Sequence, residues 1–350
     1  PSSLDTDADF VVLHGDNAQG KTSVLEAVHV LATLKSFREA RARRWIQIGA
    51  TSARLAAQVH TELGVRRLQW VFEDSARRLS LDGVSDPKLE SWFSCIRAVV
   101  FCPEDIAIVR GEPGLRRRFV DRAAFTLRPG HLGLVQDYRK VLKHKVALLK
   151  QRASLAQREV YDAELARLGA RLIVRRREAV QALQDPLNQL HTKIAGSGVV
   201  DLALKSRGAS NDVQAEDEIR DALASAIAQR SDDELIRGQA LIGPHRDELE
   251  IRIDERLARN FASQGQARSV VLALKLAQWS AAGAGGDPPL FLLDDLGSEL
   301  DVHRRERLLE LLGSLPGQVW VTTTGLDFVA SVPASERLNL TVRGGEVSRD

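Results

Sequence analysis

Eight residues near the start of the chain have the types and spacing that bind phosphate. They are Gly15-Asp16-Asn17-Ala18-Gln19-Gly20-Lys21-Thr22. The glycines let backbone N–H groups wrap a polyphosphate, and a helix that follows adds the positive end of its dipole. In this phosphate-loop pattern Lys21 reaches the β and γ phosphates, and the Thr22 hydroxyl, with Ser23 beside it, lies where Mg²⁺ binds.

A second candidate for metal chemistry stands late in the chain, where four apolar residues precede two acids. The string is Leu290-Phe291-Leu292-Leu293-Asp294-Asp295. A buried strand can hold a carboxylate at its end, so we predict Asp294 as the second Mg²⁺ ligand. Asp295 is placed to orient or deprotonate an attacking water. With the phosphate loop, this pair predicts hydrolysis of a nucleoside triphosphate, with Lys21 and Asp295 as the catalytic residues.

Strands and helices must hold both motifs in place. The apolar run 10–14 predicts a buried strand before the phosphate loop, and Val24, Leu25, Val28 and Leu31 recur at helical spacing after it. Further strands are predicted at 98–101, 249–253, 290–293 and 319–322, with several between 53 and 83. Helices are predicted at 265–279 and 304–312. The alternation of strands and helices at both ends of the chain indicates an α/β domain.

The middle of the chain is helical from about residue 136. Six apolar residues alternate steps of four and three, which predicts a heptad seam. They are Leu142, Val146, Leu149, Ala153, Ala156 and Val160. We expect Pro186 to interrupt the pattern. Residues 136–195 hold thirteen Lys/Arg and six Asp/Glu, a local net charge of +7. This arm is either a solvated helical face or a basic surface for nucleic acid.

These patterns predict an α/β fold with a phosphate-loop lobe that is split by a mainly helical insertion. We place the first lobe at residues 1–125 and 285–350. The second lobe, at 126–284, carries the short coiled-coil-like arm.

Two further strings specify the class of hydrolase. Ser263-Gln264-Gly265-Gln266 precedes a helix, and Gly297-Ser298-Glu299-Leu300-Asp301 follows the acid pair. In this order the four motifs resemble the ABC-type ATPases. The resemblance implies that ATP and Mg²⁺ bind between two copies of the chain, with the signature serine, glycine and glutamine of one copy completing the other copy's site. Asp301 would end the loop between them. Ser263 could equally cap the helix that follows, and the two uses are compatible.

Other strings resemble the RecF family of bacterial recombination mediators, and they cover about residues 11–324. The most specific are Gly243-Pro244-His245-Arg246-Asp247 and Arg116-Arg117-Arg118; others are Lys35-Ser36-Phe37-Arg38 and Pro103-Glu104-Asp105. The resemblance implies a cytoplasmic, nucleoid-associated ATPase with weak, DNA-stimulated turnover. ATP would close its homodimer on duplex, gapped or junction DNA, and RecR and RecO would join it in loading RecA.

Basic residues near the middle of the chain are the candidates for DNA contacts. Their guanidinium and ammonium groups suit phosphate, without reading base sequence. The candidates are Arg116, Arg117, Arg118, Lys140 and Lys143. The arginine triplet could also be an ordinary solvated helix face.

The chain departs from these families at three places. An N-terminal string typical of RecF is absent before Gly15, so we expect the outer sheet and some adenine contacts to be incomplete. Asp295 replaces the usual glutamate and has a shorter reach. The switch histidine of transporter ATPases is replaced by Thr322-Thr323-Thr324, whose hydroxyls could still sense a γ-phosphate. The segment around Pro103 would take the role of the ABC glutamine loop.

Composition excludes several other classes. The 350 residues carry a formal net charge of +2 and two cysteines, which we expect to be buried thiols in a reducing cytoplasm. No apolar stretch is long enough for a membrane span, and the histidines show no metal-ligand spacing. Three alternatives stay open: a small-molecule kinase, the nucleotide-binding subunit of an ABC transporter, and an SMC-like head, although the arm is short for the last.

Overall fold

The computed structural model describes residues 4–38, 42–73, 77–284, 286–295 and 302–350. The chain divides into two compact units. The first comprises residues 1–105, 193–195 and 272–350, and the second comprises 106–192 and 196–271. Each unit is described by itself.

These bounds differ from the predicted boundaries at 125/126 and 284/285. Residues 106–125 belong to the second unit and not to the first. Among their contacts in that unit is the ion pair of Arg116 with Glu248. Residues 272–283 group with the first unit, where the Trp279 ring packs on Phe291 with 5.0 Å between ring centroids. Which residues make up independently folding lobes stays a prediction.

A six-stranded sheet forms the centre of the first unit, in the order β13-β12-β1-β11-β10-β6. All neighbouring pairs are parallel except β12 with β13. The strands are β1 (Phe10–His14), β6 (Ala98–Phe101), β10 (Leu290–Leu293), β11 (Val319–Thr323), β12 (Arg337–Arg343) and β13 (Glu346–Arg349). The wholly apolar runs predicted as buried strands are confirmed, since parallel strands covered on both faces are apolar throughout. The pair β12–β13 was not predicted.

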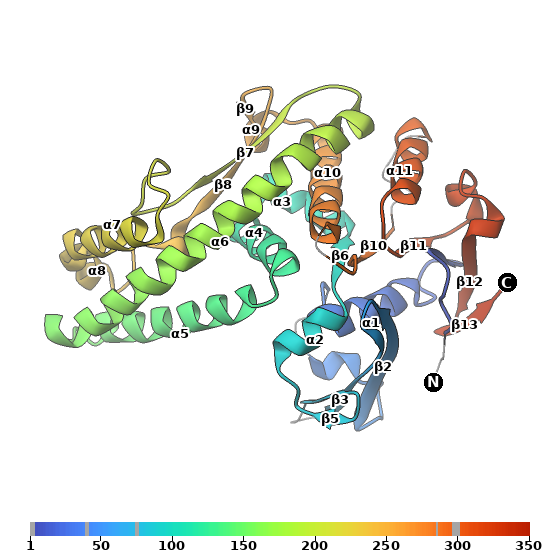
Figure 1. The fold of residues 1–350 in the computed structure, drawn as a ribbon, viewed down its shortest axis with the longest axis horizontal. Coiled ribbons are helices and arrows are strands. Elements are labelled where there is room, and N and C mark those ends of the chain that lie inside the picture. Colours follow the sequence, from blue (N-terminus) through green and yellow to red (C-terminus); the bar gives the residue numbers. More distant parts are fainter. Residues whose placement is uncertain (1–3, 39–41, 74–76, 285, 296–301) are drawn as a thin grey trace. The chain divides into compact units, whose positions relative to one another are not determined.

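Helices cover both faces of this sheet. They are α1 (Lys21–Thr33), α2 (Leu89–Cys95), the second half of α10 (Gln264–Gly283) and α11 (Val302–Ser314). Figure 1 shows α1 and α11 on opposite sides of the sheet. Each parallel strand therefore ends beside the start of a helix or loop at one edge, which is where open α/β sheets bind ligands.

A four-stranded antiparallel sheet packs on the other side of α1, in the order β2-β3-β4-β5. Its strands are β2 (Ser52–Thr61), β3 (Gly64–Glu73), β4 (Arg77–Leu81) and β5 (Val84–Ser85). Side chains alternate between solvent and core, as in any one-sided sheet. Trp70 and Phe72 are buried on the inner face, with 4.2 Å between their ring centroids.

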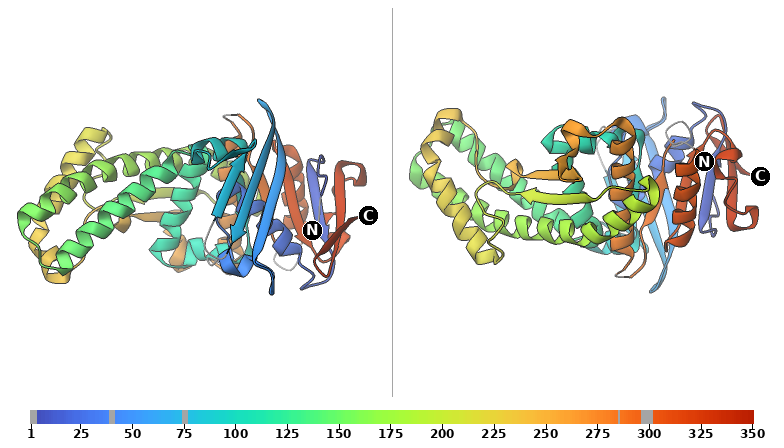
Figure 2. Two further views of the ribbon diagram at one scale, coloured as in Figure 1. Left: turned by 90° about the horizontal axis from the view of Figure 1, so that it is seen from below. Right: turned by 90° about the horizontal axis from the view of Figure 1, so that it is seen from above.

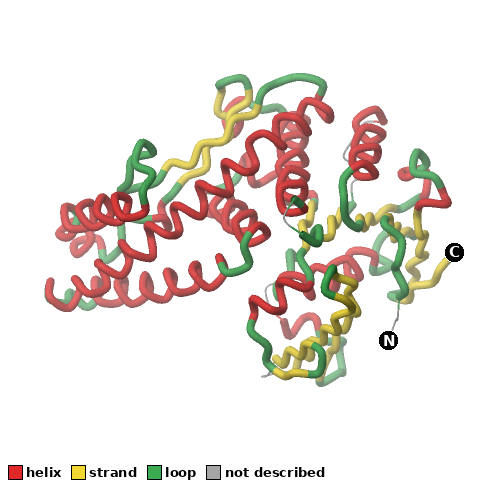
Figure 3. Tube along the Cα trace, in the orientation of Figure 1, coloured by secondary structure: helices red, strands yellow, loops and turns green. Residues whose placement is uncertain are grey.

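The second unit is mainly helical, as Figure 3 shows in red. Its helices are α3 (Ala107–Arg110), α4 (Pro113–Leu127), α5 (His131–Lys150), α6 (Leu155–Ala195, whose last residues belong to the first unit), α7 (Glu216–Gln229), α8 (Ser231–Arg237) and α9 (Ala258–Phe261). A three-stranded sheet lies beside them, formed by β7 (Val200–Lys205), β8 (Glu248–Ile253) and β9 (Arg256–Leu257). Short 3₁₀ turns complete the chain at Ala42–Trp45, Pro103–Ile106, Pro244–Arg246, Leu326–Val329 and Ala334–Glu336.

The arm is a helical hairpin, so the prediction of one continuous heptad seam from Leu142 to Val160 is wrong. Helix α5 ends at Lys150, Arg152 takes φ +52°, and α6 starts after a capping box in which Ser154 bonds Gln157. Figure 2 shows the two helices running back along each other. Val160 is exposed, because the turn moves it away from the face that Leu149 buries.

The predicted interruption at Pro186 is also wrong, because α6 continues through it to Ala195. A proline inside a helix lacks one backbone donor, yet neighbouring side chains bind this part of α6 to β7. Gln184 donates to the Val200 carbonyl at 2.7 Å and accepts the Leu202 amide at 2.9 Å. Asn188 accepts the Val200 amide at 2.8 Å. These contacts hold the helix while they cover the free edge of β7.

Candidate active site

The phosphate loop lies between β1 and α1, as predicted. Its backbone takes positive φ at Gly15 (+142°), Ala18 (+62°) and Gly20 (+106°), so successive amides turn inward. A Cβ at Gly15 would lie 2.5 Å from the Val342 carbonyl oxygen. Glycine is therefore required at this position by both conformation and space.

Lys21 begins α1 and is 9% exposed. Its ammonium donates to the carbonyls of Gly15 (2.7 Å) and Asp16 (2.8 Å). The charge is thus directed into the loop, where phosphate oxygens would be stronger acceptors than carbonyls. Asn17, Ala18 and Ser23 are exposed around it.

The turn between β12 and β13 supports the loop from the outside. The Gly344 amide donates to the Gln19 side-chain oxygen at 2.7 Å, and the Gly345 amide donates to the Gln19 carbonyl at 2.9 Å. The His14 ring lies 2.6 Å from the Asp350 carboxylate. These contacts join residues more than three hundred positions apart, and no local pattern indicates them.

Asp294 directly follows β10 and lies beside Thr22, as predicted. Its Oδ1 accepts the Thr22 hydroxyl at 2.9 Å and the Thr322 hydroxyl at 2.8 Å, and the residue is 6% exposed. Burial raises the pKa of Asp294, against opposing effects of both hydroxyls and of the Arg38 charge. Hard oxygen donors in this arrangement fit Mg²⁺, whose other ligands in nucleotide sites are water and phosphate. The candidate metal ligands Thr22 and Asp294 therefore lie together.

Asp295 is exposed, with φ +45°, and its amide donates to the Thr322 hydroxyl at 2.9 Å. Thr322 thus positions both acids, a role that the sequence did not indicate. That a threonine of this triplet senses phosphate stays a prediction. Thr322 and Thr323 are buried, and their hydroxyls bond within the protein. Thr324 alone of the triplet is exposed.

Arg38 is a further candidate that the prediction omitted, although the string containing it was noted. Its side chain is half exposed and lies 3.9 Å from Glu26, and its charge lowers the pKa of Asp294. An arginine that acts electrostatically on the metal-binding acid can also act on phosphate charge. The phosphate-loop pattern does not indicate it, because that pattern ends at Thr22.

The signature residues belong to the second unit. Ser263, Gln264 and Gln266 are exposed at the start of α10. The Ser263 hydroxyl accepts the Gln266 amide at 3.2 Å, and the Gln266 side chain accepts the Ser263 amide at 2.9 Å. This reciprocal capping box confirms the helix-cap interpretation. Contacts of Ser263 and Gly265 with a second copy stay a prediction, and Asp301 lies outside the described residues.

The candidate DNA contacts divide into two groups. Arg116 is 3% exposed, forms an ion pair with Glu248 and donates to the Gly111 carbonyl at 2.7 Å. Its prediction as a DNA contact is therefore corrected, because a buried, paired guanidinium cannot reach phosphate. Arg117 is partly buried and donates to the Asp247 carbonyl at 2.8 Å. Arg118, Lys140 and Lys143 are exposed.

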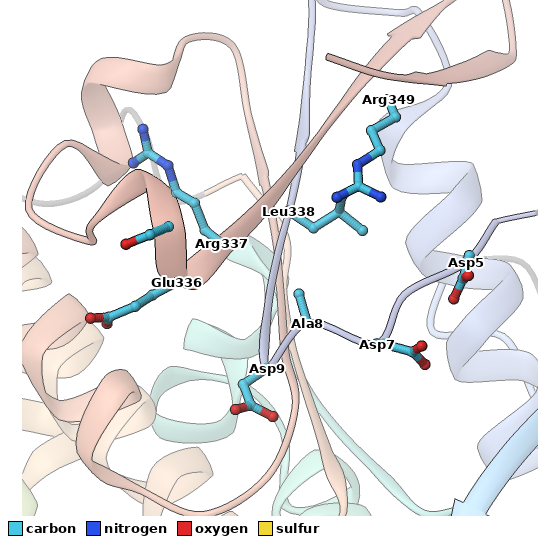
Figure 4. Close-up of a pocket in the computed structure, with 9 residues that line it drawn as sticks. Asp5, Asp7, Ala8, Asp9, Glu336, Arg337, Leu338 and Arg349 are labelled. Atoms are coloured by element: carbon cyan, nitrogen blue, oxygen red, sulfur yellow. The ribbon is translucent and has the colours of Figure 1, made fainter.

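Other candidate sites are weaker. A pocket of about 370 Å³ is lined by residues that include Asp5, Asp7, Asp9, Arg337 and Arg349 (Figure 4). It lies at the amino end of β1, opposite the phosphate loop. Both cysteines are free and buried, as predicted. Within the described residues no cluster of metal-ligating side chains occurs, and no helix is long and apolar enough to cross a membrane.

Comparison with known proteins identifies the family. Residues 112–324 match the family described as "AAA domain, putative AbiEii toxin, Type IV TA system". The DNA replication and repair protein RecF of Anaeromyxobacter sp. (strain Fw109-5) is 38% identical over 341 residues, covering 96% of this chain and 92% of its own. RecF of Geobacter sulfurreducens is 40% identical, covering 91% and 87%.

Solved structures agree in fold. The recombination mediator protein RecF-ATP in the RecFOR pathway superposes with a TM-score of 0.87 at 24% identity, over 99% of this chain and 93% of that one. The Smc head domain from Pyrococcus furiosus reaches 0.55 at 14% identity, over 97% and 89%. The chain has the ABC-type ATPase fold shared by RecF and SMC heads, and it belongs to the RecF family of DNA replication and repair proteins.

Proposed function

We propose that this chain is an ATP-driven DNA clamp. ATP and Mg²⁺ bind at the phosphate loop, two copies close around DNA at a gap or a junction of single and double strands, and slow hydrolysis opens them. The observation that carries the proposal is the meeting of Lys21, Thr22 and Asp294 at one sheet edge, with Thr22 Oγ1 2.9 Å from the Asp294 carboxylate. Membership in the RecF family supports the role in repair.

Each residue at the site has one part in hydrolysis. Lys21 and the amides from Gly15 to Ser23 bind the phosphates, and Thr22 with Asp294 holds Mg²⁺, which neutralises charge on the transferred phosphoryl group. Asp295 orients water, with its backbone held by Thr322. Ser263, Gln264, Gly265 and Gln266 of a second copy complete the site, with Asp301 between the two copies.

The DNA surface that we propose is the exposed face of α5. Arg139, Lys143 and Lys150 recur at steps of four and seven, which places them on one side of the helix, and Lys140 adjoins them. All four are exposed, and together they span about 16 Å along the axis. Cations along one helix face, without base-reading partners, favour binding to the phosphate backbone. Arg118 is a further candidate.

The test measures DNA binding by fluorescence anisotropy with ATP, with ADP and without nucleotide, together with mass by light scattering. We expect ATP alone to give a dimer that binds gapped duplex, and Lys21→Met to lose both properties. An ATP-driven dimer without affinity for DNA would favour a transporter-type ATPase instead. Phosphoryl transfer to a metabolite without dimer formation would favour a kinase.

The α5 surface has its own test. Each lost phosphate contact lowers the slope of log affinity against log salt by about 0.9, so the pair Lys140→Gln and Lys143→Gln should lower it by about 2. Lys205→Gln, at an exposed lysine outside the arm, is the matched control. An unchanged slope in the double variant would remove α5 from the interface. RecR, RecO and RecA as partners, and a cytoplasmic, nucleoid-associated location, are proposed from the family alone.

A further inference from the structure

Two aromatic rings on the arm take no part in the phosphate contacts proposed above. The His144 ring, exposed on α5, stacks on the partly exposed Tyr161 ring of α6. The ring centroids are 5.8 Å apart and the ring planes differ by 27°, which is the offset arrangement that aromatic rings prefer. We call these two residues the stacking pair. Because His144 is exposed, a further planar group can extend the stack.

Other side chains of α5 already hold the arm together. The Lys145 ammonium, next to His144 in the chain, is fully buried between Asp162 of α6 (2.7 Å) and Glu234 of α8 (2.6 Å). Leu149, one turn further on, is also fully buried. The inner side of α5 therefore joins the helices of the arm, and the stacking pair lies at the solvent side of this contact.

Two lysines of the proposed DNA surface adjoin the stacking pair. Lys140 precedes His144 by four residues, so the two side chains lie on one side of α5, and Lys143 is the chain neighbour of His144. Both lysines are exposed. A lysine here can bind a phosphate of the same strand whose base contacts the ring.

The nearby acids of α6 leave this positive charge in place. Asp162 is paired with the buried lysine, and Glu164 accepts two hydrogen bonds from the Arg167 guanidinium, at 2.6 and 2.8 Å. Glu159 lies two residues before Tyr161, which turns it to the opposite side of α6. The side of the arm that carries the stacking pair is therefore suited to an anionic, planar ligand.

Exposed rings beside cations are the means by which proteins bind single-stranded nucleic acid. A positive surface follows the backbone, and successive bases stack on the aromatic side chains. The bases of a continuous duplex are already stacked on one another, so a side chain cannot cover their faces unless a base leaves the stack. Lysines alone bind the backbone of either form. The stacking pair adds a preference for unpaired bases.

We propose that His144 and Tyr161 form a base-stacking site for single-stranded DNA, through which the arm distinguishes a gap from a continuous duplex. An unpaired base stacks on the His144 ring, Tyr161 supports that ring from its other face, and Lys140 with Lys143 binds the adjoining phosphates. The inference rests on the proposed DNA surface of α5 and specifies which part of a gapped DNA this surface selects.

The test measures stacking with 2-aminopurine, a fluorescent base whose emission falls when it stacks. One gapped duplex carries this base in its single-stranded part, a second carries abasic positions there, and a third duplex has no gap. Tyr161→Leu and His144→Gln each remove one ring, and Tyr161→Phe keeps it. Lys140→Gln is the matched control, because it removes a charge and no ring. All variants are full chains, and thermal unfolding checks their fold.

We expect the wild type to quench the fluorescent base and to bind the gapped duplex more tightly than the abasic one. Tyr161→Leu and His144→Gln should lose the quenching and bind the gapped duplex about 5- to 150-fold more weakly, the range of one lost base stack. Their affinity for the continuous duplex should not change. Tyr161→Phe should match the wild type. Lys140→Gln should weaken binding to all three DNAs alike and keep the quenching at saturation.

Quenching that survives in both His144→Gln and Tyr161→Leu, or equal affinity of the wild type for the gapped and abasic DNAs, would overturn the inference. His144→Gln changes an exposed side chain, so it decides the question even if Tyr161→Leu is unstable.

The clamp and the stacking site fail separately. Binding that needs neither ATP nor a dimer would refute the clamp, whereas the difference between the gapped and abasic DNAs would still decide the stacking site. An ATP-dependent dimer that binds all three DNAs equally would keep the clamp and refute the stacking site. A wild type that binds none of them would refute both.

Discussion

Two carboxylates, the buried Asp294 in the first unit and the partly buried Asp121 in the second, have opposite environments. Asp294 in the first unit accepts two hydroxyl groups, and burial raises its pKa. Asp121 in the second unit binds the Arg176 guanidinium through both oxygens, at 2.8 and 3.1 Å, and lies 3.2 Å from the His131 ring. Burial alone would raise the pKa of Asp121, but the His131 contact and the Arg176 charge lower it to about 2.

This difference in partners indicates that Asp121 has a structural role, whereas Asp294 is available to bind a ligand. Asp121 has its counter-charge inside the fold, so its charge is already compensated. Among the residues that the structure describes, Asp294 forms no ion pair. The charge of Arg38 affects the pKa of Asp294 by electrostatic attraction, without a salt bridge between them. A buried carboxylate in this state favours a cation from outside, which agrees with an Mg²⁺ ligand.

The largest effect is expected from Arg176→Met. This change leaves the buried Asp247 and the partly buried Asp121 without their shared partner, and breaking a buried pair typically costs about 3–5 kcal/mol. All five tryptophans lie in the first unit and both tyrosines lie in the second. Unfolding in urea should therefore shift in circular dichroism, which follows the helices, far more than in tryptophan fluorescence. Equal shifts in both signals would mean that Arg176 does not stabilise its own unit selectively.

Asp294→Asn should lower activity but not stability, unlike Arg176→Met. Loss of one charge-stabilising group typically lowers a rate by about 10²–10³-fold, and ATP hydrolysis should fall by that amount. Because burial raises the pKa of Asp294, the folded protein is more stable when this group is neutral, and its charge costs stability as pH rises through that pKa. The nucleotide-free variant should therefore melt at a higher temperature at neutral pH. A lower melting temperature would contradict the comparison.

Acid titration should measure how much the ion pair of Asp121 with Arg176 stabilises the fold. Its folded pKa of about 2 lies below the usual unfolded value of about 3.9, so its contribution is complete above about pH 5 and is lost progressively as pH falls through about 2. The contribution is about 2.6 kcal/mol. Circular dichroism of the wild type and of Asp121→Asn, compared from pH 5 to 2, measures it. A variant with the same pH dependence as the wild type would show that another group controls acid unfolding.

Gly15→Ala should give a smaller effect, located at the phosphate loop. The new Cβ would meet the Val342 carbonyl at 2.5 Å, and overpacking of this kind costs about 1–3 kcal/mol. Gly64→Ala is the matched control, because Gly64 also has positive φ (+106°) but no atom within 4 Å of the added carbon. Only Gly15→Ala should also weaken ATP binding, measured by fluorescence titration. If Gly64→Ala lost as much stability as Gly15→Ala, the positive φ of the glycine, rather than the contact of its Cβ with β12, would explain the loss.

Much of the nucleotide site could be predicted from sequence because its chemistry is encoded in short runs. Lys21 follows its glycines directly, and Asp294 ends an apolar run whose burial is evident from composition. The arm was predicted less well. Local periodicity does not reveal that the chain reverses at Arg152 or that side-chain bonds hold α6 through Pro186. The strands β12 and β13 were missed for the same reason, since their stability depends on pairing with β1.

The sequence by itself determined the family and predicted the reaction type and the residues that bind phosphate, because these depend on residue identity at fixed short spacing. The tertiary structure decided which charges are free to act. Arg116 and Arg118 are two residues apart in one run, yet Arg116 is buried against Glu248 and Arg118 is exposed. Asp294 is buried and Asp121 is partly buried, but of these two acids only Asp121 forms an ion pair with an arginine. Burial and partner choice arise from contacts between distant segments, so local spacing cannot specify them.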